Sequence, residues 1–248
     1  MSYKYNILSL DEDKIIEEIS NFAVHLGKRV YVVGGAVRDA LLNRKTLYTK
    51  DVDLAGNLTI EELIEFLKSR EISFEIKNRR LEVLSFDVLD VHYEYARLRR
   101  EQYLDKDTHT PTIVQFVDEV DEDAKRRDFT VNSVYYDRHS SSILDPLGGV
   151  QDIKDRIVRP VLGEDTFKVD PARIIRFVEL VCRFQLNVQE EVFSWAKKYS
   201  QNVYRLSASR LKKERERLAT KTKYEDENDD YINRVYSLLK ELNLQDIL

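Results

Sequence analysis

The chain has 248 residues, of which 42% are hydrophobic and 34% are charged, so it can bury the core of one large domain or two small ones. Its net charge of −5 argues against indiscriminate binding to nucleic acid. No apolar stretch is long enough to span a bilayer, and the N-terminus lacks the pattern of a signal peptide. The single cysteine, Cys182, excludes an internal disulfide, and we expect a buried thiol in a reducing cytoplasm.

The first 150 residues mix helical and strand patterns. Amphipathic helices are expected at 11–28 and 59–70, and in the second Thr59 and Glu62 have the spacing of a capping box. The β-branched run at 29–33 predicts a buried strand that ends at two glycines, after which another helix begins. Further strands are expected at 50–54, 72–76, 81–89, 91–98 and 112–117, with a polar loop at 100–112 and a segment at 121–137 that starts helical and ends as a strand.

After Val150 the strand signals largely stop. Helices are expected at 168–184, 187–199, 207–220 and 228–244, with Asp170-Pro171, Asn187 and Ser207 as candidate N-terminal caps. We therefore predict an α/β domain over residues 1–150 and an all-α domain over 151–248. Residues 205–217 hold six basic side chains against two acidic ones, so a local basic face on an acidic protein is possible.

Two aspartates, Asp51 and Asp53, lie two residues apart on a predicted strand, so both side chains leave the same face. Two such anions favour a hard cation between them, and Mg²⁺ takes its remaining ligands from substrate phosphates. The alternative is a solvated strand end. If the strand at 91–98 pairs beside this one, Glu94 completes a cluster of three carboxylates, with Asp90 as the rival for the third position.

Gly34 and Gly35 stand between a predicted strand and a helix. Bare backbone at a helix N-terminus lets N–H groups approach a phosphate closely, although a plain tight turn has the same signature. Arg38 follows in the first turn, where it either contacts a nucleotide or pairs with its neighbour Asp39.

These motifs, taken in chain order, resemble those of the polymerase-β-like nucleotidyltransferases. More closely, they resemble the class II branch that contains the CCA-adding tRNA nucleotidyltransferases and the bacterial poly(A) polymerases. The resemblance covers roughly residues 29–218, and six motifs in order are far more specific than one. The matching stretches are "GGAVRD" with "DVD", "YEYARLRRE", "RRDFTVNS" at 126–133, "DPLGGVQDIKDRIVRPV" at 145–161, "VDPARIIRFVELVCRF" and "RLSASRLKKERERL".

The resemblance implies an α+β fold, in which a polymerase-β-like head with a mixed sheet and flanking helices is followed by an all-α neck. It implies Mg²⁺-dependent addition of CMP and AMP, from CTP and ATP, to a tRNA 3′ end without a nucleic-acid template. Asp51, Asp53 and Glu94 would hold the metal ions. The nucleotide would be bound by Gly34, Gly35, Arg38, Arg126, Arg127, Asp128, Asn132, Asp170, Arg173 and Arg176.

Within the nucleotide site, Asp128 and Asn132 would recognise the ribose, and Arg126 and Arg127 would reach the triphosphate. Asp170 and Arg173 would act as the template that reads the base edges, with Arg176 on the same face. Without the resemblance, residues 125–128 read as a basic helix end, and Asp170 reads as a helix cap.

Three features depart from the family pattern or leave it open. Val169 stands where the base-selecting motif normally has glutamate, and residues 105–111 occupy the family's flexible loop without its usual glycine and arginine residues. The body and tail with which family members grip tRNA have no counterpart in the matched stretch, so the grip on tRNA stays open. Poly(A) addition, partial CCA addition, and a non-catalytic nucleotide- or RNA-binding module are the alternative functions. The sequence does not indicate an oligomeric state.

Overall fold

The computed structural model describes residues 13–42, 51–103, 111–220 and 228–247. The chain divides into two compact units. Of the described residues, the first contains 13–102 and 111–154, and the second contains Tyr103, 155–220 and 228–247. Each unit is described separately.

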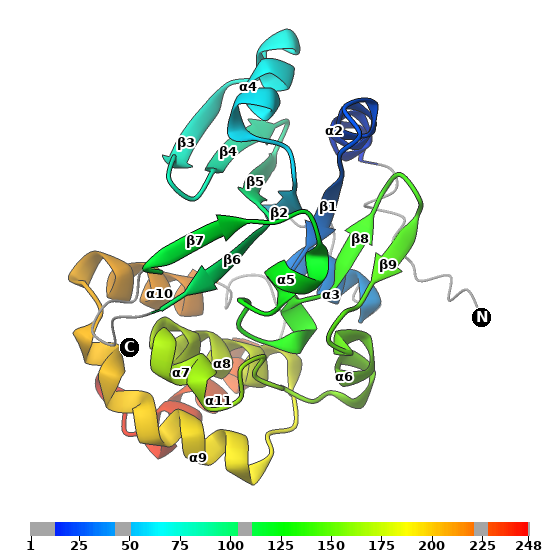
Figure 1. Ribbon diagram of the computed structural model, residues 1–248. Coiled ribbons are helices and arrows are strands. Elements are labelled where there is room, and N and C mark those ends of the chain that lie inside the picture. The colour runs from blue at the N-terminus through cyan, green and yellow to red at the C-terminus, as the bar shows by residue number, and fades with distance from the viewer. Residues whose placement is uncertain (1–12, 43–50, 104–110, 221–227, 248) are drawn as a thin grey trace. The chain divides into compact units, whose positions relative to one another are not determined.

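A mixed seven-stranded sheet forms the centre of the first unit, in the order β3-β4-β5-β2-β1-β8-β9 (Figure 1). β2 and β5 are parallel, while the other neighbours pair antiparallel. This mixed sheet with flanking helices, followed by a helical C-terminal region, confirms the predicted α+β class. The strands are β1 (Val30–Val33), β2 (Asp51–Gly56), β3 (Phe74–Asn78), β4 (Val83–Val88), β5 (Val91–Arg97), β8 (Tyr135–Asp137) and β9 (Ser142–Leu144).

One face of this sheet is covered by two amphipathic helices, α2 (Lys14–His25) and α4 (Ile60–Ser69). Their rings Phe22 and Phe66 lie 5.2 Å apart between centroids. The buried Tyr93 of β5 donates a hydrogen bond to the carboxylate that caps α2, and Thr59 caps α4 in the predicted capping box. The tyrosines of β5 therefore point to this face, which leaves the opposite face for Asp51 and Asp53 of β2 and Glu94 of β5.

The opposite face carries α5 (Val120–Ala124) and a small two-stranded sheet of β6 (Arg99–Gln102) and β7 (Ile113–Phe116). The prediction of a loop from residue 100 onward is wrong for the stretch that forms β6. The strand has no apolar alternation because its buried side chains are charged, and Arg99 Nε donates to Glu101 Oε1 at 2.7 Å. The predicted loop at 105–111 lies, except for Pro111, outside the described residues.

Between α5 and β8 the chain makes the short 3₁₀ turn η1 (Thr130–Asn132), so the segment does start helical and end as a strand. The helix α3 (Gly35–Leu41) follows β1 directly, with Gly34 at its N-cap position. Within the described part of the chain, no helix is both long and apolar enough to cross a membrane.

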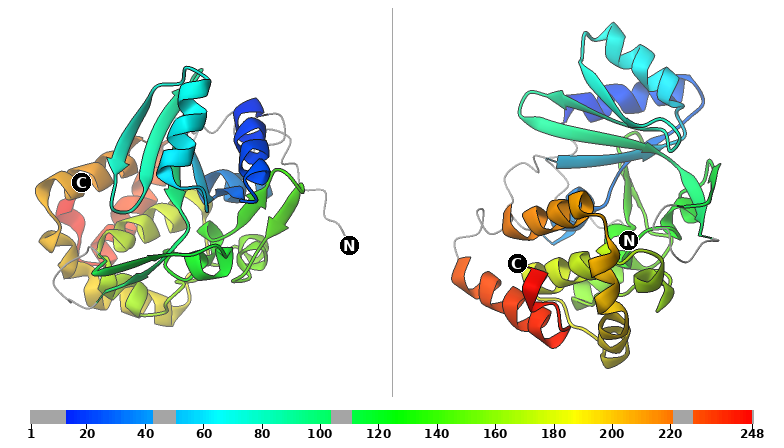
Figure 2. Two further views of the ribbon diagram at one scale, coloured as in Figure 1. Left: turned by 45° about the horizontal axis from the view of Figure 1, so that its top comes forward. Right: turned by 90° about the vertical axis from the view of Figure 1, so that its left-hand side faces the viewer.

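The second unit is built from helices, and α8 lies beside α10 and α11 (Figure 2). Cys182 of α8 is buried, and burial raises the pKa of its thiol to about 12. Helix α6 (Gly149–Asp155) leads into this unit. The helices of the second unit are α7 (Asp165–Val169), α8 (Ala172–Phe184), α9 (Glu190–Tyr199), α10 (Ala208–Thr220) and α11 (Asn228–Glu241). The unit also contains the short 3₁₀ turns η2 (Ser200–Arg205) and η4 (Gln245–Ile247).

Two expectations about these helices need correction. The helix predicted at 168–184 is interrupted at Asp170, which is extended (φ −143°, ψ 100°) because the following Pro171 disfavours helical geometry in the residue before it. Asn187 does not cap α9, which has Gln189 at its N-cap, and instead donates its backbone N–H to Arg156 O. Ser207 does cap α10, since its hydroxyl accepts from Arg210 N.

Candidate functional site

The two aspartates of β2 lie on the sheet face opposite α2 and α4. Asp51 and Asp53 are exposed, while Val52 and Leu54 between and after them are buried, as strand alternation requires. Their strand pairs in parallel with β5, and Asp53 stands directly opposite Glu94 in the register. Cross-strand partners project to the same face, so three carboxylates share one exposed end of the sheet.

The competing third carboxylate lies elsewhere. Asp90 is an exposed residue in the turn that joins β4 to β5, and it precedes the first residue of β5. Glu94 is flanked by the buried Tyr93 and Tyr95, whose rings face the core. The burial of these two tyrosines therefore places Glu94 on the opposite face of the sheet, the face of Asp53.

The chemistry of this donor set fits Mg²⁺. Hard carboxylate oxygens are available on two adjacent strands, and this ion is commonly held by one or two carboxylates plus phosphate oxygens of the substrate. Within the described residues, no group of three His, Cys, Asp or Glu side chains is gathered closely enough to hold a metal ion alone.

Gly34 brings the backbone next to these carboxylates. It has φ 78° and ψ −133°, a conformation that side-chain-bearing residues rarely adopt, and a Cβ at this position would lie 3.2 Å from Asp53 Oδ2. The glycine is thus required both by backbone geometry and by the neighbouring carboxylate. Gly35 opens α3, so the first N–H groups of that helix lie at the same end of β1 as Asp53.

Arg38 is buried, with 5% of its surface exposed. Its Nε and Nη2 donate to Asp39 Oδ1 at 2.9 and 2.8 Å, so the alternative in which the two neighbours pair is realised. Its Nη1 donates to Asn132 Oδ1. The buried Arg38 therefore links the glycine turn to Asn132, which belongs to the predicted motif at 126–133.

Asp128 and Asn132 are joined by that same network. Asn132 Nδ2 donates to Asp128 Oδ1 at 3.1 Å, and Asp128 Oδ1 also accepts from Phe129 N at 2.8 Å. Asn132 is the last residue of η1, whereas Asp128 precedes the extended Phe129, so the two residues do not belong to one helix. The structure thus brings together Gly34, Arg38, Asn132 and Asp128 through α3 and η1.

The guanidiniums of Arg126 and Arg127 converge on one carboxylate that sequence reasoning missed. Asp123 is fully buried, and its Oδ1 accepts from Arg126 Nε at 2.8 Å while its Oδ2 accepts from Arg127 Nη2 at 2.9 Å. Tyr135 donates its hydroxyl to the same Oδ2 at 2.8 Å. The two arginines are thus partly buried members of a network, not the basic solvated helix end that the sequence allows.

Burial alone would raise the pKa of Asp123, but the charges of Arg126 and Arg127 outweigh it and lower the pKa below its ordinary value. Conversely, the pKa of Tyr135 is raised, chiefly by burial. The only sequence signal for Asp123 is its spacing of three and four residues before the arginines, which is the spacing of helical ion pairs.

Asp170, Arg173 and Arg176 lie in the second unit. Pro171, and not the predicted Asp170, occupies the N-cap position of α8, but Asp170 Oδ1 still accepts from Ala172 N at 3.0 Å, and its Oδ2 lies 3.8 Å from Arg210 Nη2. Arg173 is buried within α8, and Arg176 Nη2 lies 3.8 Å from the buried Glu214 Oε1 of α10. The start of α8 is therefore tied by charge to α10, the helix with the basic stretch.

Comparisons with known proteins identify the family of the chain. Residues 30–159 match the poly A polymerase head domain family. CCA-adding enzymes of Lactobacillus helveticus and Streptococcus uberis are 34% and 33% identical over 76% and 74% of this chain, which spans 45% and 44% of theirs. The chain thus spans about half the length of these curated relatives.

Solved structures share the fold. A Bacillus stearothermophilus CCA-adding enzyme in complex with CTP superposes with a TM-score of 0.74 at 25% identity, over 93% of this chain and 52% of that one. A tRNA nucleotidyltransferase complexed with a primer tRNA and an incoming ATP analog superposes with a TM-score of 0.69 at 24% identity, over 90% of this chain and 62% of that one.

Proposed function

We propose that this chain, which belongs to the poly A polymerase head domain family, adds CMP and AMP from CTP and ATP to the 3′ end of tRNA without a nucleic-acid template. Residues 1–150 would be the catalytic head, and residues 151–248 the neck that selects the nucleotide. The relatives named CCA-adding enzyme support this activity over the other activities of the family. The proposed compartment is the cytoplasm, where tRNA and nucleoside triphosphates are available.

The observation that carries the proposal is the pairing of Asp53 with Glu94 beside Gly34. Exposed carboxylates, bare backbone and a helix N-terminus meet at one end of β1 and β2. A nucleoside triphosphate requires this combination, because its phosphates need both a divalent cation and N–H donors. A solvated strand end does not require a glycine held at positive φ against a carboxylate.

Asp51, Asp53 and Glu94 would hold Mg²⁺. When bound, the ion supplies charge neutralisation for the triphosphate and lowers the pKa of the attacking 3′-hydroxyl. The protein's own contribution is to hold the carboxylates on adjacent strands. Their spacing is set by the sheet register, so they need little reorganisation when the substrate arrives.

The remaining residues would bind and orient the nucleotide. The N–H groups after Gly34 would face the phosphates, with Arg126 and Arg127 as guanidinium donors. Asp128 would accept from the ribose hydroxyl, held in place by Asn132. In the neck, Asp170 and Arg173 would read the base edges and Arg176 would support them.

A set of single-nucleotide assays tests the proposal. Each NTP is offered alone to tRNAs that end before the first C, before the second C and before A, in the presence of Mg²⁺. We expect CMP incorporation on the first two and AMP incorporation on the third, with no addition from UTP or GTP. Failure to add CMP to any of these tRNAs, by a folded protein, would contradict the proposal.

Poly(A) addition is the second candidate, because the matching family carries that name. It predicts steady addition of many adenosines to an unrelated RNA, and no preference for tRNA ends. Partial addition predicts that either the CMP or the AMP step is missing. A non-catalytic binding module predicts that labelled pyrophosphate does not exchange into CTP when Mg²⁺ and a tRNA primer are present.

A further inference from the structure

The arginine cluster lies on the same face of the sheet as the metal-binding carboxylates. Glu94, Asp53, Val33 and Tyr135 are successive pairing partners across β5, β2, β1 and β8. Because cross-strand partners project to one face, the ring of Tyr135 stands in the same row as the two carboxylates. Tyr135 is two strands away from Asp53, which corresponds to roughly 10 Å at the usual strand spacing.

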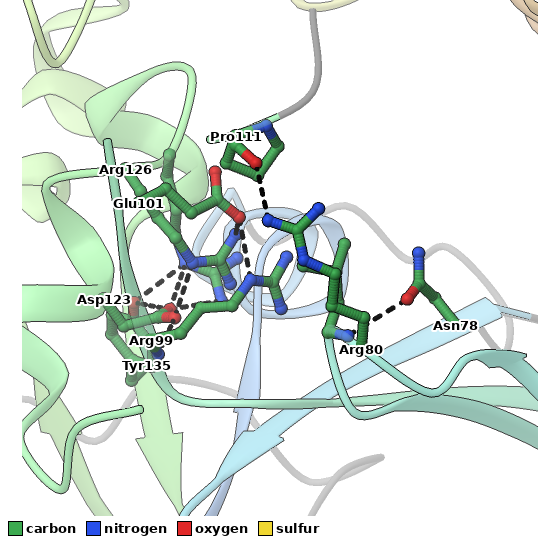
Figure 3. A network of polar contacts seen from close by, with 10 residues as sticks. Asn78, Arg80, Arg99, Glu101, Pro111, Asp123, Arg126 and Tyr135 are labelled. Atoms are coloured by element: carbon green, nitrogen blue, oxygen red, sulfur yellow. Dashed lines mark hydrogen bonds and ion pairs between the residues drawn. The ribbon is translucent and has the colours of Figure 1, made fainter. Parts of the chain in front are cut away.

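Helix α5 packs against this row. Its Val120 and Ala124 join Val33 and Tyr135 in one buried apolar cluster. Asp123, between them in the sequence, points to the polar side of the cluster, where Figure 3 shows it surrounded by Arg99, Arg126 and Tyr135. The position of Asp123 is therefore fixed by apolar packing of its own helix against the sheet.

Both oxygens of Asp123 are occupied by hydrogen-bond donors from three parts of the chain. Besides Arg126 Nε, Oδ1 accepts from the backbone N–H of Arg99 at 3.1 Å, which ties α5 to the start of β6. Oδ2 accepts from Arg127 and from Tyr135, and Arg127 Nε also donates to the Tyr135 hydroxyl at 2.8 Å. Charge-assisted bonds of this kind fix the orientation of a guanidinium.

The cluster holds more positive than negative charge. Three guanidiniums, of Arg99, Arg126 and Arg127, face the two carboxylates of Asp123 and Glu101. Arg99 is 7% exposed, and its Nη1 is buried without a hydrogen-bond partner among the described residues. Burial, and next the charge of Arg126, lower the pKa of Arg99. An anion bound beside the cluster would balance the excess positive charge of its guanidiniums.

We propose that Asp123 is a positioning residue, which holds the guanidiniums of Arg126 and Arg127 in place for the triphosphate of the incoming nucleotide. This inference rests on the proposed function of the same site. Asp123 is completely buried, so a phosphate cannot replace it, and it binds Arg126 through Nε. An arginine ordered in advance loses less side-chain entropy when it binds phosphate.

The test compares Asp123→Asn with Asp121→Asn, a matched control on the same helix whose side chain is exposed. Binding of CTP and of inorganic tripolyphosphate is measured by calorimetry, with unfolding curves to verify that each variant is folded. We expect Asp123→Asn to weaken both ligands about tenfold, because the triphosphate and not the base is affected. In the addition assay, KM for CTP and for ATP should rise by the same factor, with a smaller change in kcat.

Tyr135→Phe provides a second variant that keeps every charge of the cluster. It removes one donor to Asp123 and one acceptor of Arg127, and we expect roughly threefold weaker tripolyphosphate binding. This variant carries the test alone if Asp123→Asn does not fold. Unchanged or tighter binding of tripolyphosphate in the folded variants would overturn the inference, because Asp123 would then be a structural residue or a competitor of phosphate.

The calorimetric binding measurements distinguish a failure of this inference from a failure of the proposed function. If the wild-type protein binds CTP in a manner that depends on Asp123 but adds no nucleotide to RNA, the positioning role stands and the activity is wrong. If nucleotides are added normally while Asp123→Asn leaves both KM and tripolyphosphate binding unchanged, the activity stands and the positioning role is wrong.

Discussion

The first unit uses the same residue type in two opposite ways on one face of its sheet. Asp51 and Asp53 are exposed at the end of β2, next to a backbone turn. Asp123 is fully buried in α5, where two arginine side chains and a tyrosine donate to it. The exposed pair lies at the surface in contact with solvent, whereas the buried carboxylate is enclosed by its hydrogen-bond donors.

The difference in burial decides whether a carboxylate contributes to folding stability or to activity. An exposed charge contributes little to folding, because solvent stabilises it in the folded and the unfolded state alike. A buried charge paired with arginines is destabilising to remove, because its partners are left buried and uncompensated. Loss of an exposed carboxylate should therefore affect activity, and loss of Asp123 should affect both stability and the geometry of the arginines.

The largest expected effect is that of Asp53→Ala on activity. The change removes a proposed metal ligand without removing core volume, so we expect nucleotide addition to fall at least about 1,000-fold, which corresponds to about 4 kcal/mol. The free energy of unfolding in urea should change by less than about 0.5 kcal/mol. A stable variant with normal activity would show that Asp53 is only a solvated strand end.

The largest expected effect on stability is that of Asp123→Ala. Removing one partner of a buried ion pair typically costs about 3–5 kcal/mol, and here at least two guanidiniums lose their carboxylate. Urea unfolding, monitored by the circular dichroism of the helices, measures the loss. Asp121→Ala on the same helix is the control and should cost less than about 0.5 kcal/mol. Equal losses in the two variants would contradict the contrast between buried and exposed carboxylates.

The two regions also differ in how far the sequence predicts them. The strand alternation that exposes Asp51 and Asp53, and the glycine pair before α3, are local patterns, so their placement follows from a few neighbouring residues. The pairing of Asp53 with Glu94 joins residues 41 positions apart, and parity restricts the choice of partner without fixing the register.

The Asp123 network was less predictable. Its donors come from β6, from the residues after α5 and from β8, and the β6 contribution depends on a charged strand that reads as a loop. Burial of charge in β6 becomes favourable only when Arg99 and Glu101 meet in the folded protein. In the second unit, by contrast, the break at Pro171 follows from a proline rule, although the sequence pattern of the helix continues through it.

Asp170 is intermediate in burial between the exposed Asp53 and the buried Asp123. It is partly buried, it accepts a hydrogen bond from Ala172 N at the start of α8, and it is the proposed reader of the base edge. Asp170→Ala should cost about 1 kcal/mol of stability, as for loss of a helix cap. It should also reduce the preference for CTP and ATP over UTP and GTP about tenfold, which single-nucleotide assays on tRNA ends measure.

The control for that change is Ser207→Ala, which removes the cap of another helix in the same unit. It should cost a similar free energy of unfolding without affecting the choice of base. If selectivity survives Asp170→Ala, or if Ser207→Ala relaxes it equally, Asp170 is a cap and not a template.

The smallest expected effect is a difference in acid sensitivity. The pKa of Asp123 is lowered in the folded protein, so its contribution to stability is complete above its ordinary value of 3.8 and is lost as the pH falls below it. The stability gap between the wild type and Asp123→Asn should therefore narrow by about 1 kcal/mol between pH 5 and pH 3. Urea unfolding at several pH values measures this gap, and the same curves for Asp121→Asn report the general effect of removing one negative charge. A gap that is constant or that widens toward pH 3 would mean that Asp123 does not keep its charge among the arginines, and the contrast with the exposed pair would then rest on burial alone.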